Sequence, residues 1–209
     1  MECTVAQDRS TENLARTLAR HRAAGFVGRE QELAALDELL AVPPAFRVLL
    51  VTGASGVGKT TLLRAFERVA AQRDVRCVSV DARDLPDEPE AMGAALDARL
   101  PADGAAQTLL LIDGFEHCAS RERWLQEHYL PALPNAVRVA IAGRWQPAAS
   151  WSTDPGWSAL TRILPLADFS AAEVGDYLEH HGMDRGHAQR LHRFTCGHPL
   201  AVAMSASLL

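Results

Sequence analysis

Continuous apolar segments alternate with amphipathic segments through most of the chain. Strands buried in a parallel sheet are apolar on both faces, whereas covering helices carry apolar residues every three or four positions. This difference predicts five strands, over 47–52, 75–82, 108–113, 136–143 and 161–166. It predicts helices over 30–41, 58–71, 89–100 and 121–130, and an irregular loop over 145–158. The alternation is typical of an α/β fold in which a parallel sheet lies between two layers of helices.

The pattern changes after residue 168, where apolar positions follow helical spacing to the end of the chain. Ser170 and Glu173 match the S-x-x-E pattern of a helix capping box. Three helices are predicted in this part, over 170–181, 184–194 and 199–209. A further helix is predicted over 10–24, after an irregular lead. We therefore expect a lead and helix over 1–24, an α/β domain over 25–168, and a small all-helical subdomain over 169–209.

Composition and charge narrow the function classes. The net charge is −5, which does not favour direct contact with nucleic acid by this domain. The chain has no apolar run long enough to span a membrane and no signal-peptide pattern at its start, so we expect a cytoplasmic protein without membrane contact. Its four cysteines are widely spaced and form no C-x-x-C pair, which argues against a disulfide framework or a zinc ribbon.

One loop carries the strongest chemical signal. Residues 53–60, GASGVGKT, fit the phosphate-binding pattern G-x-x-x-x-G-K-[ST] between a predicted strand and a predicted helix. Lys59 is the only lysine in a chain with 20 arginines, and a slim ammonium suits a tight phosphate cradle better than a guanidinium. The predicted fold is therefore a P-loop NTPase three-layer sandwich followed by the helical subdomain. The residues expected to bind the nucleotide phosphates are Gly53, Ala54, Ser55, Gly56, Val57, Gly58, Lys59, Thr60 and Thr61.

A P-loop needs an acidic residue across the sheet to complete a magnesium site. Asp113 ends the apolar strand TLLLID, at the edge where parallel α/β sheets bind ligands. We expect Thr60 and Asp113 to hold Mg²⁺, with Lys59 on the phosphates. Glu116 is expected to polarise the attacking water, although a glutamate at a helix start is common without any catalytic role. Arg144 follows the next strand and is expected to sense the γ-phosphate.

Several segments, taken in order, resemble the STAND class of P-loop ATPases (signal transduction ATPases with numerous domains). These segments are FVGRE at 26–30, the P-loop, IDGFEH at 112–117, AGRWQP at 142–147, LPLADFSAAEVGDYL at 164–178 and TCGHPLAVAMSASLL at 195–209. The class includes NB-ARC and NACHT modules and the ATPase modules of bacterial LuxR-type and antibiotic-pathway transcription regulators. The resemblance implies that Val27, Gly28 and Arg29 contact the nucleotide, with Val27 and Arg29 over the adenine and near the phosphates. It implies that Pro199 packs against the adenine.

The resemblance also implies a function. Such modules bind ATP or ADP with Mg²⁺, hydrolyse ATP slowly, rest in an ADP-held off state, and rearrange or assemble when ATP replaces ADP. The expected partners are the nucleotide and other protein domains or protomers. Ala142 and Gly143 replace a small hydroxyl pair of the class, and the chain ends soon after G-H-P-L, so we expect an incomplete helical subdomain.

Two other functions stay open. A non-catalytic interaction module would use the nucleotide only structurally, and the altered residues Gly114, Ala142 and Gly143 favour it. A small-molecule kinase would use the same cradle, but the sequence offers no evident acceptor lid. Trp145, Trp151 and Trp157 are expected to anchor the 145–158 loop to the surface or to a partner.

Overall fold

A computed structural model describes residues 14, 17–18, 25–101 and 106–208 of the chain. The predicted helix over 10–24 lies mostly outside these residues. The described part contains a five-stranded parallel sheet in the order β2-β3-β4-β1-β5. The strands are β1 (Val48–Thr52), β2 (Arg76–Asp81), β3 (Thr108–Asp113), β4 (Val137–Gly143) and β5 (Thr161–Pro165). The α/β fold predicted from the continuous apolar runs is thus confirmed.

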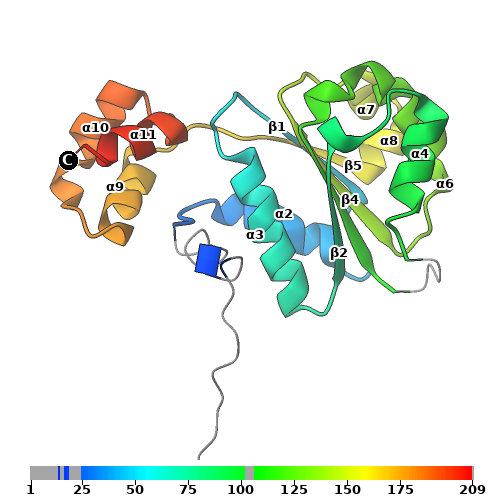
Figure 1. Cartoon of the computed structure of the whole chain (residues 1–209), viewed down its shortest axis with the longest axis horizontal. Helices are drawn as coiled ribbons and strands as arrows, with labels where there is room; N and C mark the ends of the chain where they lie inside the picture. The colour runs from blue at the N-terminus through cyan, green and yellow to red at the C-terminus, as the bar shows by residue number, and fades with distance from the viewer. Residues whose placement is uncertain (1–13, 15–16, 19–24, 102–105, 209) are drawn as a thin grey trace, which may run out of the picture.

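Helices cover both faces of the sheet (Figure 1). One face packs against α2 (Glu30–Leu40) and α3 (Lys59–Gln72), and alternate strand residues such as Leu49 and Val51 join their core. The residues between them, such as Val48 and Leu50, point to the other face. That face is covered by α4 (Pro89–Asp97) and by a helical segment that comprises α5 (Glu122–Trp124), a π-helical turn (Leu125–Tyr129) and α6 (Leu130–Ala132).

The π-helical turn and the 145–158 segment depart from the sequence prediction. Pro131 has no N–H to donate, and the helical ladder before it widens into a π turn. The predicted irregular loop contains two short helices, α7 (Ser150–Thr153) and α8 (Pro155–Leu160). Trp145 and Trp151 donate their indole N–H groups to one oxygen of Glu122, at 3.2 and 2.7 Å. These bonds fix the segment to α5, as expected for tryptophans that anchor a surface segment.

The helical subdomain lies beside the carboxyl edge of the sheet and is connected to it through the segment after β5 (Figure 1). It consists of α9 (Ala171–His180), a 3₁₀ turn (Arg185–His187), α10 (Ala188–Thr195) and α11 (Pro199–Ala206). Its core is separate and small, and is formed by Val174, Leu178, Ala188, Leu191, Val202 and Ala206. The predicted capping box is present, because Ser170 and Glu173 each bond the backbone N–H of the other. None of the helices in the described residues is long and apolar enough to cross a membrane.

Candidate nucleotide-binding site

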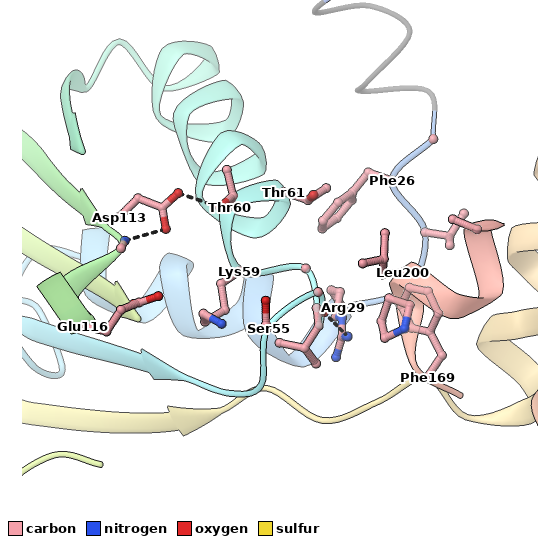
Figure 2. Close-up of a pocket in the computed structure, with 18 of the residues that line it drawn as sticks. Phe26, Arg29, Ser55, Lys59, Thr60, Thr61, Asp113, Glu116, Phe169 and Leu200 are labelled. Atoms are coloured by element: carbon pink, nitrogen blue, oxygen red, sulfur yellow. Dashed lines mark hydrogen bonds between the residues drawn. The ribbon is translucent and has the colours of Figure 1, made fainter. Parts of the chain in front are cut away.

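A cavity of about 530 Å³ lies between the α/β domain and the helical subdomain. Its polar end is formed by the P-loop together with Asp113 and Glu116, whose side chains extend from the end of β3 (Figure 2). Its apolar end includes Phe26 and Leu200, whose side chains lie near each other (Figure 2). The volume falls within the range of about 300–1,000 Å³ that is usual for small-ligand sites. A site with a polar end and an apolar end suits a phosphorylated ligand with an aromatic base.

The P-loop connects the end of β1 to the start of α3, and Gly58 lies at its last turn. Gly58 has a φ of 102°, and a Cβ atom placed on it would meet nothing within 4 Å. Gly58 therefore borders open space, directly before α3 begins at Lys59. The helix start supplies backbone N–H groups and a positive dipole end, both of which favour an anion.

Lys59 points its ammonium group into the loop. Its Nζ atom donates to the carbonyl oxygens of Gly53 and Ala54, at 2.8 and 2.7 Å. Burial lowers the pKa of Lys59, and the negative charges of Glu116 and Asp113 oppose this effect. The ammonium group thus lies inside the loop, and oxygens of a bound phosphate would take the place of these two carbonyl oxygens.

Thr60 lies in the first turn of α3, after β1, and meets Asp113 at the end of β3, although β4 lies between these two strands. The hydroxyl of Thr60 donates to Oδ2 of Asp113 at 2.6 Å, and Oδ1 of Asp113 accepts the N–H of Gly114 at 2.9 Å (Figure 2). Hydroxyl and carboxylate oxygens are the ligands that Mg²⁺ prefers. Among the described residues, no group of three His, Cys, Asp or Glu side chains could hold a metal alone. The pair therefore fits an ion that also takes oxygens from phosphates and water.

Glu116 lies in the 3₁₀ turn Phe115–His117, which follows β3. Its Oε2 accepts the backbone N–H of Arg144 at 2.8 Å. Partial burial raises the pKa of Glu116, but hydrogen bonds from backbone N–H groups, including that of Arg144, and the charge of Lys59 outweigh it, so the net pKa is lowered. The carboxylate is therefore ionised near neutral pH, with one oxygen held.

Gly143 lies where a side chain would not fit. A Cβ atom at this position would lie 2.8 Å from Cε3 of Trp145 and 3.0 Å from Oε2 of Glu116. A hydroxyl-bearing side chain at this position would clash with the bond between Glu116 and the Arg144 backbone. The side chain of Arg144 itself is exposed and does not line the cavity.

Arg29 is buried at the start of α2, in a left-handed conformation with a φ of 69°. Its guanidinium donates to the carbonyl of Val57 in the P-loop at 3.2 Å and to the carbonyl of Ala167 after β5 at 2.8 Å. It also pairs with Glu32 at 3.1 Å and lies 5.0 Å from the ring centre of Phe169. Arg29 lines the cavity, but both terminal nitrogens of its guanidinium already bond groups of the protein.

Most of the predicted site residues meet at this cavity. Those that line it are Val27, Arg29, Ser55, Gly56, Val57, Gly58, Lys59, Thr60, Thr61, Asp113, Glu116 and Pro199. Those that do not line it are Gly28, Gly53, Ala54 and Arg144. Gly28 packs against Glu173 of α9, since a Cβ atom there would lie 2.8 Å from Oε1. Gly53 and Ala54 instead supply carbonyls to Lys59.

The sequence prediction missed Asp81 and Arg83 at the polar end. Asp81 ends β2 and is the register partner of Asp113, and both it and Arg83 line the cavity. The Arg83 guanidinium, at 3.0 and 3.1 Å, holds the pKa of Asp81 down to about 2. The sequence pattern could have indicated Asp81, because β2 and β3 both end in aspartate. The apolar residues Phe26, Phe169, Tyr177, Leu200 and Ala203 were also missed, since apolar positions on helices are usually core.

Fold and site together define a P-loop NTPase. In the sheet, β4 lies between β1, which leads into the P-loop, and β3, which ends in Asp113. The carboxylate of Asp113 faces the P-loop and bonds the hydroxyl of Thr60. Comparison with known proteins agrees at this level. The family model of the AAA ATPase domain matches residues 25–88, which contain the FVGRE segment and the P-loop. No curated protein matches the chain.

Solved structures show the same fold. The RuvB Holliday junction branch migration motor of Thermotoga maritima is similar, with a TM-score of 0.57 and 17% sequence identity. Two point variants of that protein match equally well. The alignment covers 87% of this chain and 61% of the RuvB chain. These structures show the fold alone, and the family model over residues 25–88 supports a nucleotide-binding ATPase module of P-loop type.

Proposed function

We propose that this chain is a nucleotide switch: it binds Mg-ATP, hydrolyses it slowly and holds ADP, as in STAND signalling or transcription-regulatory proteins. One observation carries the proposal, namely that the cavity is formed jointly by the α/β domain and the helical subdomain. A nucleotide in it would contact the P-loop at one end and α11 at the other. Its state would then bias how the two parts are arranged.

The residues divide the chemistry among them. Lys59 and the P-loop N–H groups bind the phosphates, and Thr60 and Asp113 would hold Mg²⁺. The ion, when bound, neutralises charge that develops on the phosphates. Glu116 uses its carboxylate to orient the attacking water, and Arg144, whose backbone N–H bonds Glu116, is proposed to respond to the γ-phosphate.

The apolar end is proposed to receive the adenine. Phe26 and Val27 approach it from the segment before α2, and Pro199, Leu200 and Ala203 approach it from α11. Exchange of ADP for ATP would be transmitted through this shared contact to other domains or protomers in the cytoplasm. The resemblance in FVGRE and G-H-P-L supports this assignment.

The test begins with the nucleotide that the purified protein carries. The protein is denatured, the released nucleotide is identified by chromatography, and Mg-ATP turnover is measured on the same batch. We expect bound ADP and slow turnover, both lost in Lys59→Ala. Nucleotide binding that is unchanged in Lys59→Ala, or absent in the wild-type protein, would refute the proposal.

The second candidate is a non-catalytic module that uses nucleotide only structurally. The bond from the Arg144 N–H to Glu116 favours it, because it occupies one oxygen of the proposed catalytic carboxylate. Glu116→Gln decides between the two. A loss of turnover at unchanged ADP affinity supports the switch, whereas equal turnover in both proteins supports the non-catalytic module.

A further inference from the structure

Three consecutive carbonyl groups of the P-loop are each held by a group from outside the loop. The carbonyl of Ser55 bonds Nε2 of His198 at 2.8 Å. The carbonyl of Gly56 accepts the N–H of Leu200 at 3.3 Å. The carbonyl of Val57 accepts from the Arg29 guanidinium at 3.2 Å. Two of the three donors therefore belong to the start of α11 in the helical subdomain.

Holding a carbonyl also orients an amide. In a trans peptide, the C=O of one residue and the N–H of the next point in opposite directions. Bonds to the carbonyls of Ser55 and Val57 therefore direct the N–H groups of Gly56 and Gly58 to the opposite side of the loop. Neither of these N–H groups has a hydrogen-bond partner among the described residues. They are free to bind an anion in the cavity that both glycines line.

The segment that carries His198 is fixed in place. Gly197 has a φ of 76°, and a Cβ atom on it would clash with the carbonyl oxygen of Phe169. Phe169 donates its N–H to the carbonyl of Gly197 at 2.8 Å, and its ring faces Arg29. The contacts thus form a closed circuit from the P-loop through His198, Gly197, Phe169 and Arg29 back to the P-loop.

Gly56 shows how closely the subdomain approaches the loop. A Cβ atom at this position would lie 2.7 Å from Cε1 of His198 and 3.0 Å from Cβ of Leu200. Its φ of 79° also disfavours any other residue. The loop therefore has no side chain at the point where His198 crosses it.

We propose that His198 is a positioning residue for phosphate binding: it holds the Ser55 carbonyl so that the Gly56 N–H faces the nucleotide. This inference rests on the proposed nucleotide-binding function. It makes docking of the helical subdomain and phosphate affinity one linked equilibrium. By linkage, nucleotide binding stabilises the docked subdomain by the same factor that docking increases nucleotide affinity.

The experiment compares His198→Ala, His198→Gln and a control, His187→Ala. Glutamine carries an amide nitrogen that can still donate to the Ser55 carbonyl. His187 is an exposed histidine of the same subdomain that does not line the nucleotide cavity. The measurements are the dissociation constants of ADP and Mg-ATP, kcat and KM, and amide hydrogen exchange at Leu200 without nucleotide.

We expect His198→Ala to weaken both nucleotides by roughly 2- to 10-fold, the value of one net hydrogen bond. KM should rise with kcat nearly unchanged, because the lost interaction acts on ground state and transition state alike. The Leu200 amide should exchange faster, since its bond to Gly56 reports docking. His198→Gln should restore most of the affinity, and His187→Ala should match the wild type.

Three results would overturn the inference: wild-type affinity in His198→Ala, no rescue by glutamine, or an equal loss in His187→Ala. Its failure is distinct from failure of the proposed function. If the wild-type protein binds nucleotide and Lys59→Ala does not, the function stands even when His198 proves neutral. If the wild type binds no nucleotide, the function fails. Leu200 exchange alone then decides whether His198 holds the docked subdomain on the P-loop, and exchange unchanged in His198→Ala refutes this role.

Discussion

Arg29→Ala separates two roles for one arginine. The sequence resemblance places Arg29 near the adenine and phosphates, whereas the structure engages its guanidinium with Glu32, Val57 and Ala167. Arg29 is 7% exposed and Glu32 is 13% exposed, so the change leaves a nearly buried carboxylate and a buried Val57 carbonyl without their donor. We therefore expect a loss of about 3–5 kcal/mol in the free energy of unfolding without any nucleotide.

The assay is urea unfolding of nucleotide-free protein, followed by the thermal midpoint, which should fall on the order of 10 °C. The matched control is Arg73→Ala, which breaks an exposed pair with Asp37 and should cost less than about 1 kcal/mol. Backbone strain does not complicate the comparison, because arginine and alanine are both disfavoured at the positive φ of this position. Equal stability of Arg29→Ala and wild type without nucleotide would refute the structural role. If ADP then stabilised the variant less than the wild type, Arg29 would act on the nucleotide instead.

Three further changes test the site. Asp113→Asn should abolish the dependence of ATP affinity on Mg²⁺, while ADP binding in the absence of Mg²⁺ stays nearly intact. Titrations with Mg²⁺ and with a chelator measure this, and an ATP affinity that still depends on Mg²⁺ contradicts the prediction. Gly143→Ala should destabilise the fold by about 1–3 kcal/mol through overpacking against Trp145 and Glu116, and urea unfolding at wild-type stability would count against that contact. The pKa of Asp81 is lowered to about 2 in the folded state, so its bond to Arg83 stabilises the fold above the unfolded pKa of about 4 and loses this effect as pH falls toward 2. Asp81→Asn should therefore flatten the stability profile over that interval by less than about 1 kcal/mol, and an unchanged profile would argue against the pair.

Local patterns predicted most of the sheet. The strand TLLLID was predicted at 108–113 and is observed as Thr108–Asp113, because a run buried on both faces leaves no ambiguity about its ends. The pairing of Thr60 with Asp113 could also be expected, because parallel strands bring their carboxyl ends to one edge of the sheet.

The features that the sequence did not predict depend on distant partners. Arg29 bonds residues 28 and 138 positions away, and no local pattern encodes such contacts. The helices α7 and α8 form in a segment rich in tryptophan and proline that Glu122 fixes from another part of the chain. Short helices of this kind depend on tertiary contacts rather than on propensity. His198 was interpreted only as part of a G-H-P motif, and its bond to Ser55 spans 143 positions.

The single lysine of this sequence, Lys59, lines the cavity, so a reaction with its amine reports on that cavity alone. An acylating reagent has a single lysine to modify besides the α-amino group, and the lowered pKa of Lys59 increases the reactive neutral fraction. A phosphate bound to that amine would protect it. The mass of the one peptide that carries Lys59 would then report the fraction of occupied sites, without a mutation or a turnover assay.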